Sequence, residues 1–142
     1  MTEIINLDAT NAIVGRLCTY AAKQALLGKK INIYNCEHAV ISGNPDYTFQ
    51  RYHHLIEDTG QPFRGPNYPK LADRFVRRIV RGMVPHKQEK GRTAFARIMC
   101  YIGVPADFKD KMTRFEPADM KDLGTVRFIT IKELIRRLGG SQ

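Results

Sequence analysis

The sequence has no long apolar run and no recognisable export signal. In a chain of 142 residues, no apolar stretch approaches the roughly 20 residues that a helix needs to cross a bilayer. The opening residues, MTEIINLDAT, lack the basic-then-apolar order of a secretory signal. We therefore expect a soluble, cytosolic chain with no membrane partner. A hydrophobic content of 43 % suffices for a packed core, and the length predicts a single domain over residues 1–142.

Cysteine is scarce, and its spacing fits no disulfide or zinc pattern. The chain has three cysteines, Cys18, Cys36 and Cys100. They are odd in number and form no C-x-x-C pair, which argues against a disulfide framework and a structural zinc site. His38 lies close to Cys36 in the sequence, but no second pair of ligands accompanies them. We expect buried free thiols in a reducing compartment and no metal site.

Catalytic motifs are missing as well. The G-K-K at residues 28–30 resembles the end of a phosphate-binding loop, but Lys23 stands where the first glycine is required. Lys30 also replaces the serine or threonine that should follow the lysine of that loop. No G-x-S-x-G motif occurs, so we interpret Ser42 as a turn residue rather than a nucleophile. The sequence predicts no enzyme, no cofactor and no small-molecule substrate.

The apolar pattern predicts an α/β fold. A strand over residues 4–7, a helix over 10–28 and a strand over 31–36 make a βαβ unit, in which the strands are parallel by default. We expect Thr10 or Asn11 to cap the helix of this unit. The other predicted elements are strands at residues 39–42 and 126–129 and helices over residues 45–56, 70–82, 92–99 and 131–138. An extended loop is predicted over residues 58–69, which are rich in proline and glycine.

Several of these helices have recognisable end signals. Asn44 followed by Pro45 fits an N-cap and a first helical residue. Thr130 and Glu133 have the spacing of a capping box. Gly82 is expected to end the helix over residues 70–82. Because these signals are local, they set element boundaries before any tertiary contact is considered.

Positive charge is concentrated in one quarter of the chain. Residues 64–97 carry ten cations against two anions, Asp73 and Glu89, whereas the other 108 residues carry 13 cations and 12 anions. Arginine outnumbers lysine seven to three in this basic segment, and its planar guanidinium suits phosphate oxygens better than an ammonium does. A localised excess of this kind indicates a polyanion-binding surface within the single domain.

The helix predicted over residues 70–82 separates charge from apolar residues. Arg74, Arg77, Arg78 and Arg81 recur at three- and four-residue spacing, where like charges destabilise a helix unless an anion neutralises them. The opposite face is apolar and includes Phe75. That apolar face suits packing on a sheet, so RNA is favoured over a membrane surface or a calmodulin-type partner. The possible base-stacking partners are Tyr68, His86 and Phe95.

Several sequence blocks together resemble one known family. The blocks are VGRLCTYAAKQALLGKK, INIYNCEHAVISGNP, RRIVRGMVPHKQEKGRTAFAR, YIGVP and FITIKELIRRLGG, at residues 14–30, 31–45, 77–97, 101–105 and 128–140. In this order they are similar to the large-subunit ribosomal proteins of the L13 family, in its archaeal and eukaryotic branch. The chain lacks the long C-terminal extension of the eukaryotic form, so the resemblance is to the archaeal type. It covers nearly the whole sequence.

The resemblance implies a fold, a function and a set of contact residues. The fold would be a three-layer α/β/α arrangement around a four-stranded, mainly parallel sheet with a basic helical and loop insertion. The protein would be a structural part of the large ribosomal subunit that binds its rRNA and neighbouring ribosomal proteins. The residues implied to contact rRNA are Arg16, Arg77, Arg78, Arg81, Gly82, Lys87, Lys90, Gly91, Arg92 and Arg97, and Arg74 joins them by helical spacing alone. Residues 98–100 depart from the family, since relatives often carry further basic residues there.

Two other functions remain open at this point. One is an extraribosomal regulator of translation that binds messenger RNA. The other is a nucleotide-handling enzyme built on the βαβ unit, which would need a phosphate-binding loop that the sequence does not contain. Tight binding of a short RNA hairpin by the free protein would favour the regulator.

Overall fold

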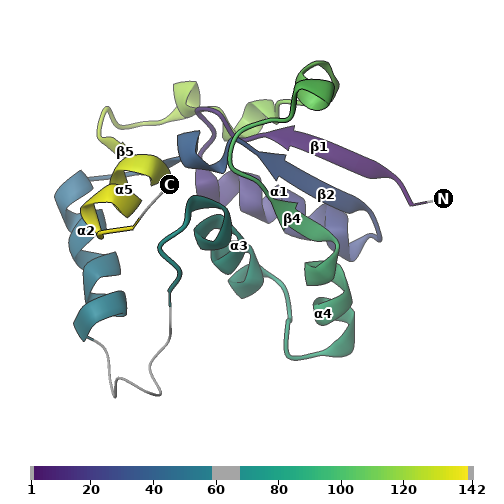
Figure 1. Cartoon of the computed structure of the whole chain (residues 1–142), viewed down its shortest axis with the longest axis horizontal. Helices are drawn as coiled ribbons and strands as arrows, with labels where there is room; N and C mark the ends of the chain where they lie inside the picture. The colour runs from purple at the N-terminus through teal and green to yellow at the C-terminus, as the bar shows by residue number, and fades with distance from the viewer. Residues whose placement is uncertain (1, 59–67, 141–142) are drawn as a thin grey trace.

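Three parallel strands form the central sheet (Figure 1). The computed structural model describes residues 2–58 and 68–140, so Arg64 and most of the loop predicted over residues 58–69 lie outside the described residues. The strands β1 (Ile4–Asp8), β2 (Lys30–Tyr34) and β4 (Ile98–Cys100) pair in the order β1-β2-β4. The helix α1 (Val14–Leu26) connects the parallel strands β1 and β2. The predicted βαβ unit is therefore confirmed.

The prediction of four strands in this sheet is wrong. Among the described residues the parallel sheet has three strands, and β3 (Val40–Ser42) pairs antiparallel with β5 (Phe128–Thr130) in a separate sheet. The chain turns between β2 and β3 at Asn35, whose φ of 58° is left-handed, and again in a 3₁₀ turn over Cys36–His38. Because of these turns, β3 does not continue the central sheet beside β2 but pairs with β5 instead. The three-layer arrangement stays a prediction.

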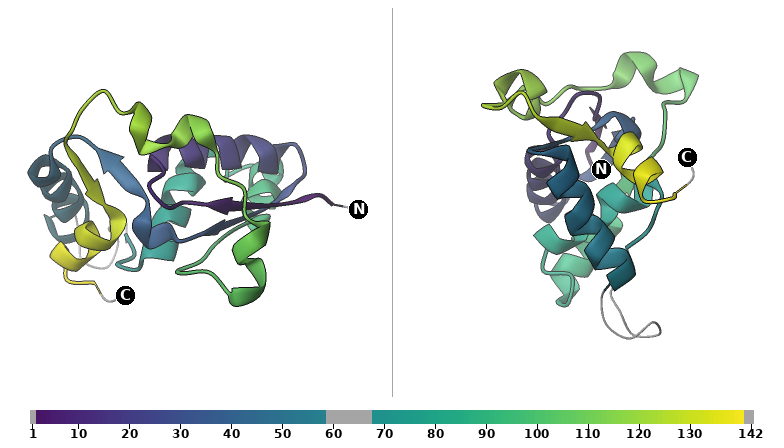
Figure 2. Two further views of the ribbon diagram at one scale, coloured as in Figure 1. Left: turned by 90° about the horizontal axis from the view of Figure 1, so that it is seen from above. Right: turned by 90° about the vertical axis from the view of Figure 1, so that its left-hand side faces the viewer.

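The other helices largely follow their sequence signals. They are α2 (Pro45–His53), α3 (Ala72–Met83), α4 (Glu89–Ala96) and α5 (Ile131–Arg137). As predicted, Asn44 caps α2 by accepting from the Asp46 N–H at 3.0 Å, and Thr130 caps α5 by accepting from the Glu133 N–H at 3.2 Å. Figure 2 shows α2, α5 and β5 gathered at one end of the molecule and the N-terminus at the other.

Three predicted boundaries are wrong. The N-cap of α1 is Ile13, which makes no side-chain capping bond, so neither Thr10 nor Asn11 caps this helix. The helix expected over residues 92–99 is α4, which begins at Glu89 and ends at Ala96. The residues that follow form β4, because Ile98 is buried beside Ile31 in the sheet. Val126, expected to begin a strand, is 94 % exposed.

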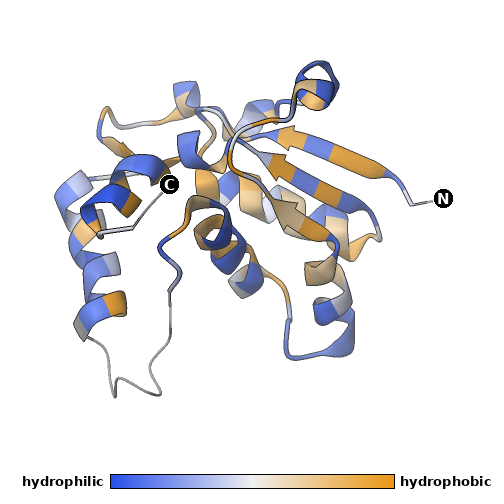
Figure 3. Ribbon diagram, viewed as in Figure 1, coloured by the Kyte–Doolittle hydropathy of each residue, from blue (hydrophilic) through white to orange (hydrophobic). Residues whose placement is uncertain are grey.

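The core lies between the sheet and the helices α1 and α3. Leu17 of α1, Ile31 and Ile33 of β2 and Phe75 of α3 are all fully buried within it, and α1 packs against α3. Figure 3 shows hydrophobic residues concentrated on the strands and hydrophilic residues at the start of α4. Cys18, Cys36 and Cys100 are buried and free, as predicted. Burial raises the pKa of the Cys18 thiol, which keeps it protonated and unreactive. No helix among the described residues has the length and apolar content needed to cross a membrane.

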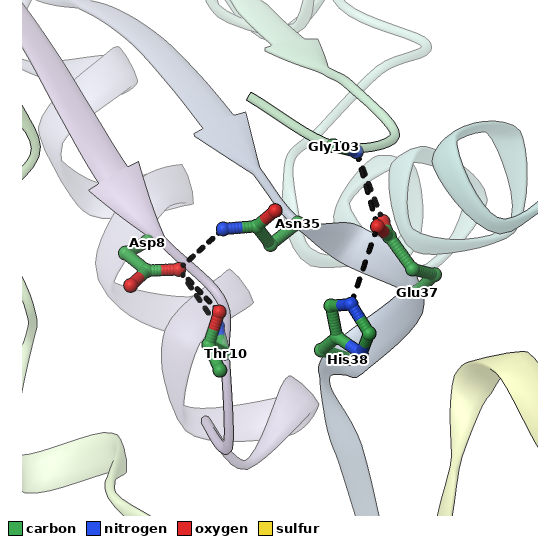
Figure 4. A network of polar contacts seen from close by, with 6 residues as sticks. All are labelled: Asp8, Thr10, Asn35, Glu37, His38 and Gly103. Carbon is green, nitrogen blue, oxygen red and sulfur yellow. Dashed lines mark hydrogen bonds and ion pairs between the residues drawn. The ribbon is translucent and has the colours of Figure 1, made fainter. Parts of the chain in front are cut away.

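A polar network ties together the carboxyl ends of the parallel strands (Figure 4). Asp8, the last residue of β1, accepts hydrogen bonds from the Thr10 N–H at 3.0 Å and from the Asn35 side-chain amide at 3.0 Å. The largely buried Glu37 carboxylate accepts from the Gly103 N–H at 3.1 Å. Ligands of open α/β sheets often bind at these strand ends. Here both carboxylates are engaged in holding the segments after β1, β2 and β4 together.

The hydrogen bonds to Asp8 should make stability depend on pH. Burial by itself would raise the pKa of Asp8, but the hydrogen bonds from Asn35 and Thr10 outweigh burial and lower this pKa below its usual value. A carboxylate of lowered pKa stabilises the fold fully above its unfolded pKa, about 3.9, and this stabilisation is lost as the pH falls through the folded pKa. We expect Asp8→Asn to lower the free energy of unfolding at pH 7. The difference from the parent protein should shrink at pH 3, as measured by urea unfolding.

The matched control is Asp107→Asn, because Asp107 is exposed. This control should leave the free energy of unfolding nearly unchanged at both pH values. A deficit of the Asp8→Asn variant that stays constant from pH 7 to pH 3 would contradict the expected role of the carboxylate charge.

Candidate nucleic-acid interface

The helix α3 places its arginines together on the outside of the fold. Its apolar residues Ala72, Phe75, Val76 and Val80 are buried. The three- and four-residue spacing leaves the arginines on the other side, as predicted. The four arginines of α3 line a single depression of about 310 Å³, together with Pro69 and Phe95. They are Arg74, Arg77, Arg78 and Arg81. We call this depression the arginine pocket.

Two arginines of the pocket are held in place by aromatic side chains. The Arg77 guanidinium lies over the Phe95 ring at 4.2 Å, and its Nε donates to the Ile98 carbonyl oxygen at 3.1 Å. The Arg78 guanidinium lies over the Tyr68 ring at 4.9 Å. Stacking on an aromatic face stabilises a cation and restricts its motion. Tyr68 and Phe95, which the sequence suggested as base-stacking partners, therefore each stack on an arginine.

The loop between α3 and α4 folds back on α3. The Val84 side chain is buried, the His86 ring Nδ1 lies 3.1 Å from the Arg81 carbonyl oxygen, and the Gln88 N–H donates to the Pro85 carbonyl oxygen at 2.9 Å. His86, the third suggested stacking residue, is thus in contact with the backbone of α3. The loop is shaped by its own contacts rather than extended into solvent.

Gly91 and Gly82, both in the set of residues implied to contact rRNA, have different environments. Gly91 is buried in the first turn of α4, and a Cβ there would overlap the carbonyl group of Pro85. It directly precedes the helix predicted over residues 92–99, but it is the third residue of α4. Gly82 is exposed in the last turn of α3, with open space where a Cβ would lie. Only Gly82 therefore presents its backbone to an outside partner.

The other predicted cations spread around the arginine pocket or lie apart from it. Lys87, Lys90 and Arg92 are exposed on the loop and on α4. Lys90 and Arg97 line a neighbouring depression of about 400 Å³. Arg97 also donates from Nη1 to the Ala25 carbonyl oxygen at 3.1 Å, near the C-terminal end of α1, so it joins α1 to α4. This second contact gives Arg97 a structural role that the sequence did not indicate.

Arg16 is not brought to the arginine pocket. Its Nη1 donates to the Pro117 carbonyl oxygen at 3.2 Å, and it lines a depression of about 550 Å³ that shares no residue with the arginine pocket. The Tyr20 and Phe115 rings stack at 4.1 Å in the wall of this depression, which also includes Lys23. Lys23 was not among the residues singled out from the sequence, although helical spacing places it on the exposed side of α1. The described residues contain no cluster of histidine, cysteine and acidic side chains suited to a metal ion.

Comparison with known proteins gives a consistent result over nearly the whole chain. Residues 2–107 match the family model described as ribosomal protein L13. A protein of Methanococcoides burtonii is 38 % identical over 134 residues, which cover 94 % of this chain and 96 % of the relative. A protein of Methanopyrus kandleri is 39 % identical over 136 residues, covering 94 % of this chain and 85 % of the relative. A third, from Methanocaldococcus jannaschii, is 40 % identical over 136 residues, covering 94 % and 96 %. All three are named large ribosomal subunit protein uL13.

Proposed function

Because the chain belongs to the ribosomal protein L13 family, we propose that it is a structural constituent of the large ribosomal subunit. We further propose that it binds large-subunit rRNA through the basic surface of α3 and α4. Its expected partners are this rRNA and neighbouring ribosomal proteins. The curated relatives are named as ribosomal proteins, in agreement with the prediction that the chain is not an enzyme. We further propose that residues 1–142 act as one domain, with the basic segment 64–97 as its RNA-binding part.

The observation that carries this proposal is the convergence of arginines in the arginine pocket. Four guanidinium groups on one helix repel one another, and RNA phosphates would neutralise them on binding. Arg77 and Arg78 are already oriented by Phe95 and Tyr68, which lowers the entropy that binding would cost. The exposed cations Lys87, Lys90 and Arg92 extend the same positive surface onto α4.

The remaining predicted contact residues have narrower proposed roles. Gly82 lets an RNA backbone approach the end of α3 closely, because no side chain stands there. Gly91 supports the surface indirectly, since it allows the loop at Pro85 to pack against α4. Arg97 would combine its contact to α1 with an outward contact to phosphate. Arg16 would make a separate RNA contact on α1, outside the arginine pocket.

Salt dependence of RNA binding tests this proposal. The logarithm of affinity for transcribed archaeal large-subunit rRNA should fall with the logarithm of salt concentration, with a slope of roughly −0.7 to −0.9 for each phosphate contact. Replacing Arg78 and Arg81 together by glutamine should make this slope shallower by roughly 1.5. The melting temperature should change little, because neither side chain belongs to the hydrophobic core. Filter binding at four salt concentrations measures the slope.

The control removes the same charge elsewhere. Lys109 and Lys111 are exposed in the 3₁₀ segment Ala106–Lys111, so the double replacement Lys109→Gln, Lys111→Gln should leave the slope nearly unchanged. Equal slopes for the two double variants would place the RNA surface away from α3. Absence of binding by the parent protein at low salt would overturn the proposed function itself.

A further inference from the structure

One nitrogen of the arginine pocket lacks a hydrogen-bond partner. The Nε of Arg81 is buried and unbonded, and among the other side chains that the structure describes no buried nitrogen or oxygen is in this state. A buried charged donor without an acceptor costs free energy, and such groups are rare in folded proteins. The Arg81 Nε–H group therefore lacks an acceptor that a ligand from outside the chain could supply.

The surroundings of this nitrogen favour an anion as the missing acceptor. Arg81 lines the pocket together with Arg74, Arg77 and Arg78, and no acidic residue lines it. The apolar walls are Pro69 and Phe95, and an apolar wall strengthens charge-assisted hydrogen bonds by limiting contact with water. Four guanidinium groups around one pocket suit an oxyanion that carries several acceptor oxygens.

The pocket is already assembled without its ligand. Arg77 is fixed by the Ile98 carbonyl and the Phe95 ring, and Arg78 is held over Tyr68. The backbone of Arg81 is held at its carbonyl by His86. The contacting groups come from the segment before α3 (Tyr68), from α4, from β4 and from the loop between α3 and α4, so the rest of the fold sets the geometry of the pocket. A preformed set of donors binds its ligand with little further ordering.

We infer that the arginine pocket is a preformed binding site for a phosphate group, in which the buried Arg81 Nε donates to one phosphate oxygen. This inference rests on the proposed function, because the RNA backbone is the expected source of that phosphate. A free oligophosphate has the same chemistry and could fill the same pocket. The site thus distinguishes the arginines of the pocket from the exposed cations Lys87, Lys90 and Arg92, which do not line it.

A pair of charge-conserving substitutions tests the inference. Arg81→Lys keeps the positive charge but removes the Nε donor and the planar guanidinium. Arg136→Lys makes the same change at an exposed arginine of α5 that does not line the pocket. Inorganic pyrophosphate is the probe, and its binding is followed by NMR through the arginine Nε–H signals, with melting temperatures recorded for every variant.

Pyrophosphate should bind the parent protein and shift the Arg81 Nε–H signal. Arg81→Lys should weaken this binding about tenfold, the effect of losing one strong charge-assisted hydrogen bond, whereas Arg136→Lys should leave it unchanged. Equal affinities of the parent and both variants, or an unmoved Arg81 signal, would overturn the inference. If Arg81→Lys loses stability, Arg78→Lys replaces it and should show the same selective loss.

Titration with transcribed archaeal large-subunit rRNA identifies the source of the phosphate. If Arg81→Lys weakens rRNA binding more than Arg136→Lys does, an RNA backbone phosphate occupies the pocket. If rRNA binds the three proteins equally while pyrophosphate still discriminates, the pocket takes a free oligophosphate. If rRNA does not bind at all and pyrophosphate still discriminates, the proposed function fails and the phosphate site stands.

Discussion

Replacing Gly91 by alanine is expected to destabilise the protein by about 3 kcal/mol. The added Cβ would overlap the carbonyl group of Pro85, and that carbonyl oxygen also accepts the Gln88 N–H at 2.9 Å. The clash is with backbone rather than with a flexible side chain, so α4 or the loop before it must move. Urea unfolding monitored by circular dichroism measures the loss.

Gly82→Ala is the matched control for this prediction. Gly82 also lies in a helix, but nothing occupies the space around its missing Cβ. Alanine is a better helix former than glycine by up to about 1 kcal/mol, so this variant should be as stable as the parent or slightly more stable. If the two alanine variants unfold at the same urea concentration, the packing of Pro85 on α4 is not what requires glycine at position 91.

Leu17→Ala should cost about 2–5 kcal/mol of stability, as expected for a large residue removed from a packed core. Leu17 is 1 % exposed, within the core that α1 shares with α3 and β2. The arginine pocket contains no residue of α1. The folded fraction of this variant should therefore bind rRNA with nearly normal affinity. Urea unfolding gives the stability, and filter binding well below the unfolding midpoint gives the affinity.

Thr19→Ala provides the control on the same helix. Thr19 is exposed, and its hydroxyl donates only to the Gly15 carbonyl oxygen within α1, at 2.8 Å, and to the Met83 sulfur at 3.6 Å. Its replacement should change the free energy of unfolding by no more than about 0.5 kcal/mol. A Leu17→Ala protein of normal stability and poor RNA affinity would mean that α1 is a recognition surface and that Leu17 lies outside the core.

The features predicted correctly were those set by residues close in sequence. The βαβ unit follows from two apolar strands around one amphipathic helix, and Asn44 and Thr130 act as caps because their acceptors reach N–H groups two or three residues away. The strand β4 was missed because three residues are too few for an alternating pattern. Its strand conformation depends on pairing with β2, which is distant in the sequence.

In the candidate site too, the sequence predicted the features that depend on local spacing and missed those that depend on tertiary contacts. Helical spacing was enough to place four arginines on one side of α3, and they do line one pocket. The sequence could not indicate that Phe95 would lie against Arg77, or that Pro85 would exclude a side chain at Gly91. Both contacts depend on tertiary structure, because the loop after α3 places α4 against α1 and β4. The unbonded Nε of Arg81 likewise depends on tertiary packing, because no local pattern determines which guanidinium becomes buried.

The pairing of β2 with β4 has a consequence for the order of events during synthesis of the chain. β1, α1 and β2 emerge first, but β2 gains its second neighbour only when Ile98 has been added. The same residue supplies the carbonyl oxygen that fixes Arg77. Closure of the sheet and completion of the arginine pocket are therefore one late step. A nascent chain that ends before β4 carries the arginines of α3 without the Ile98 carbonyl oxygen that fixes Arg77.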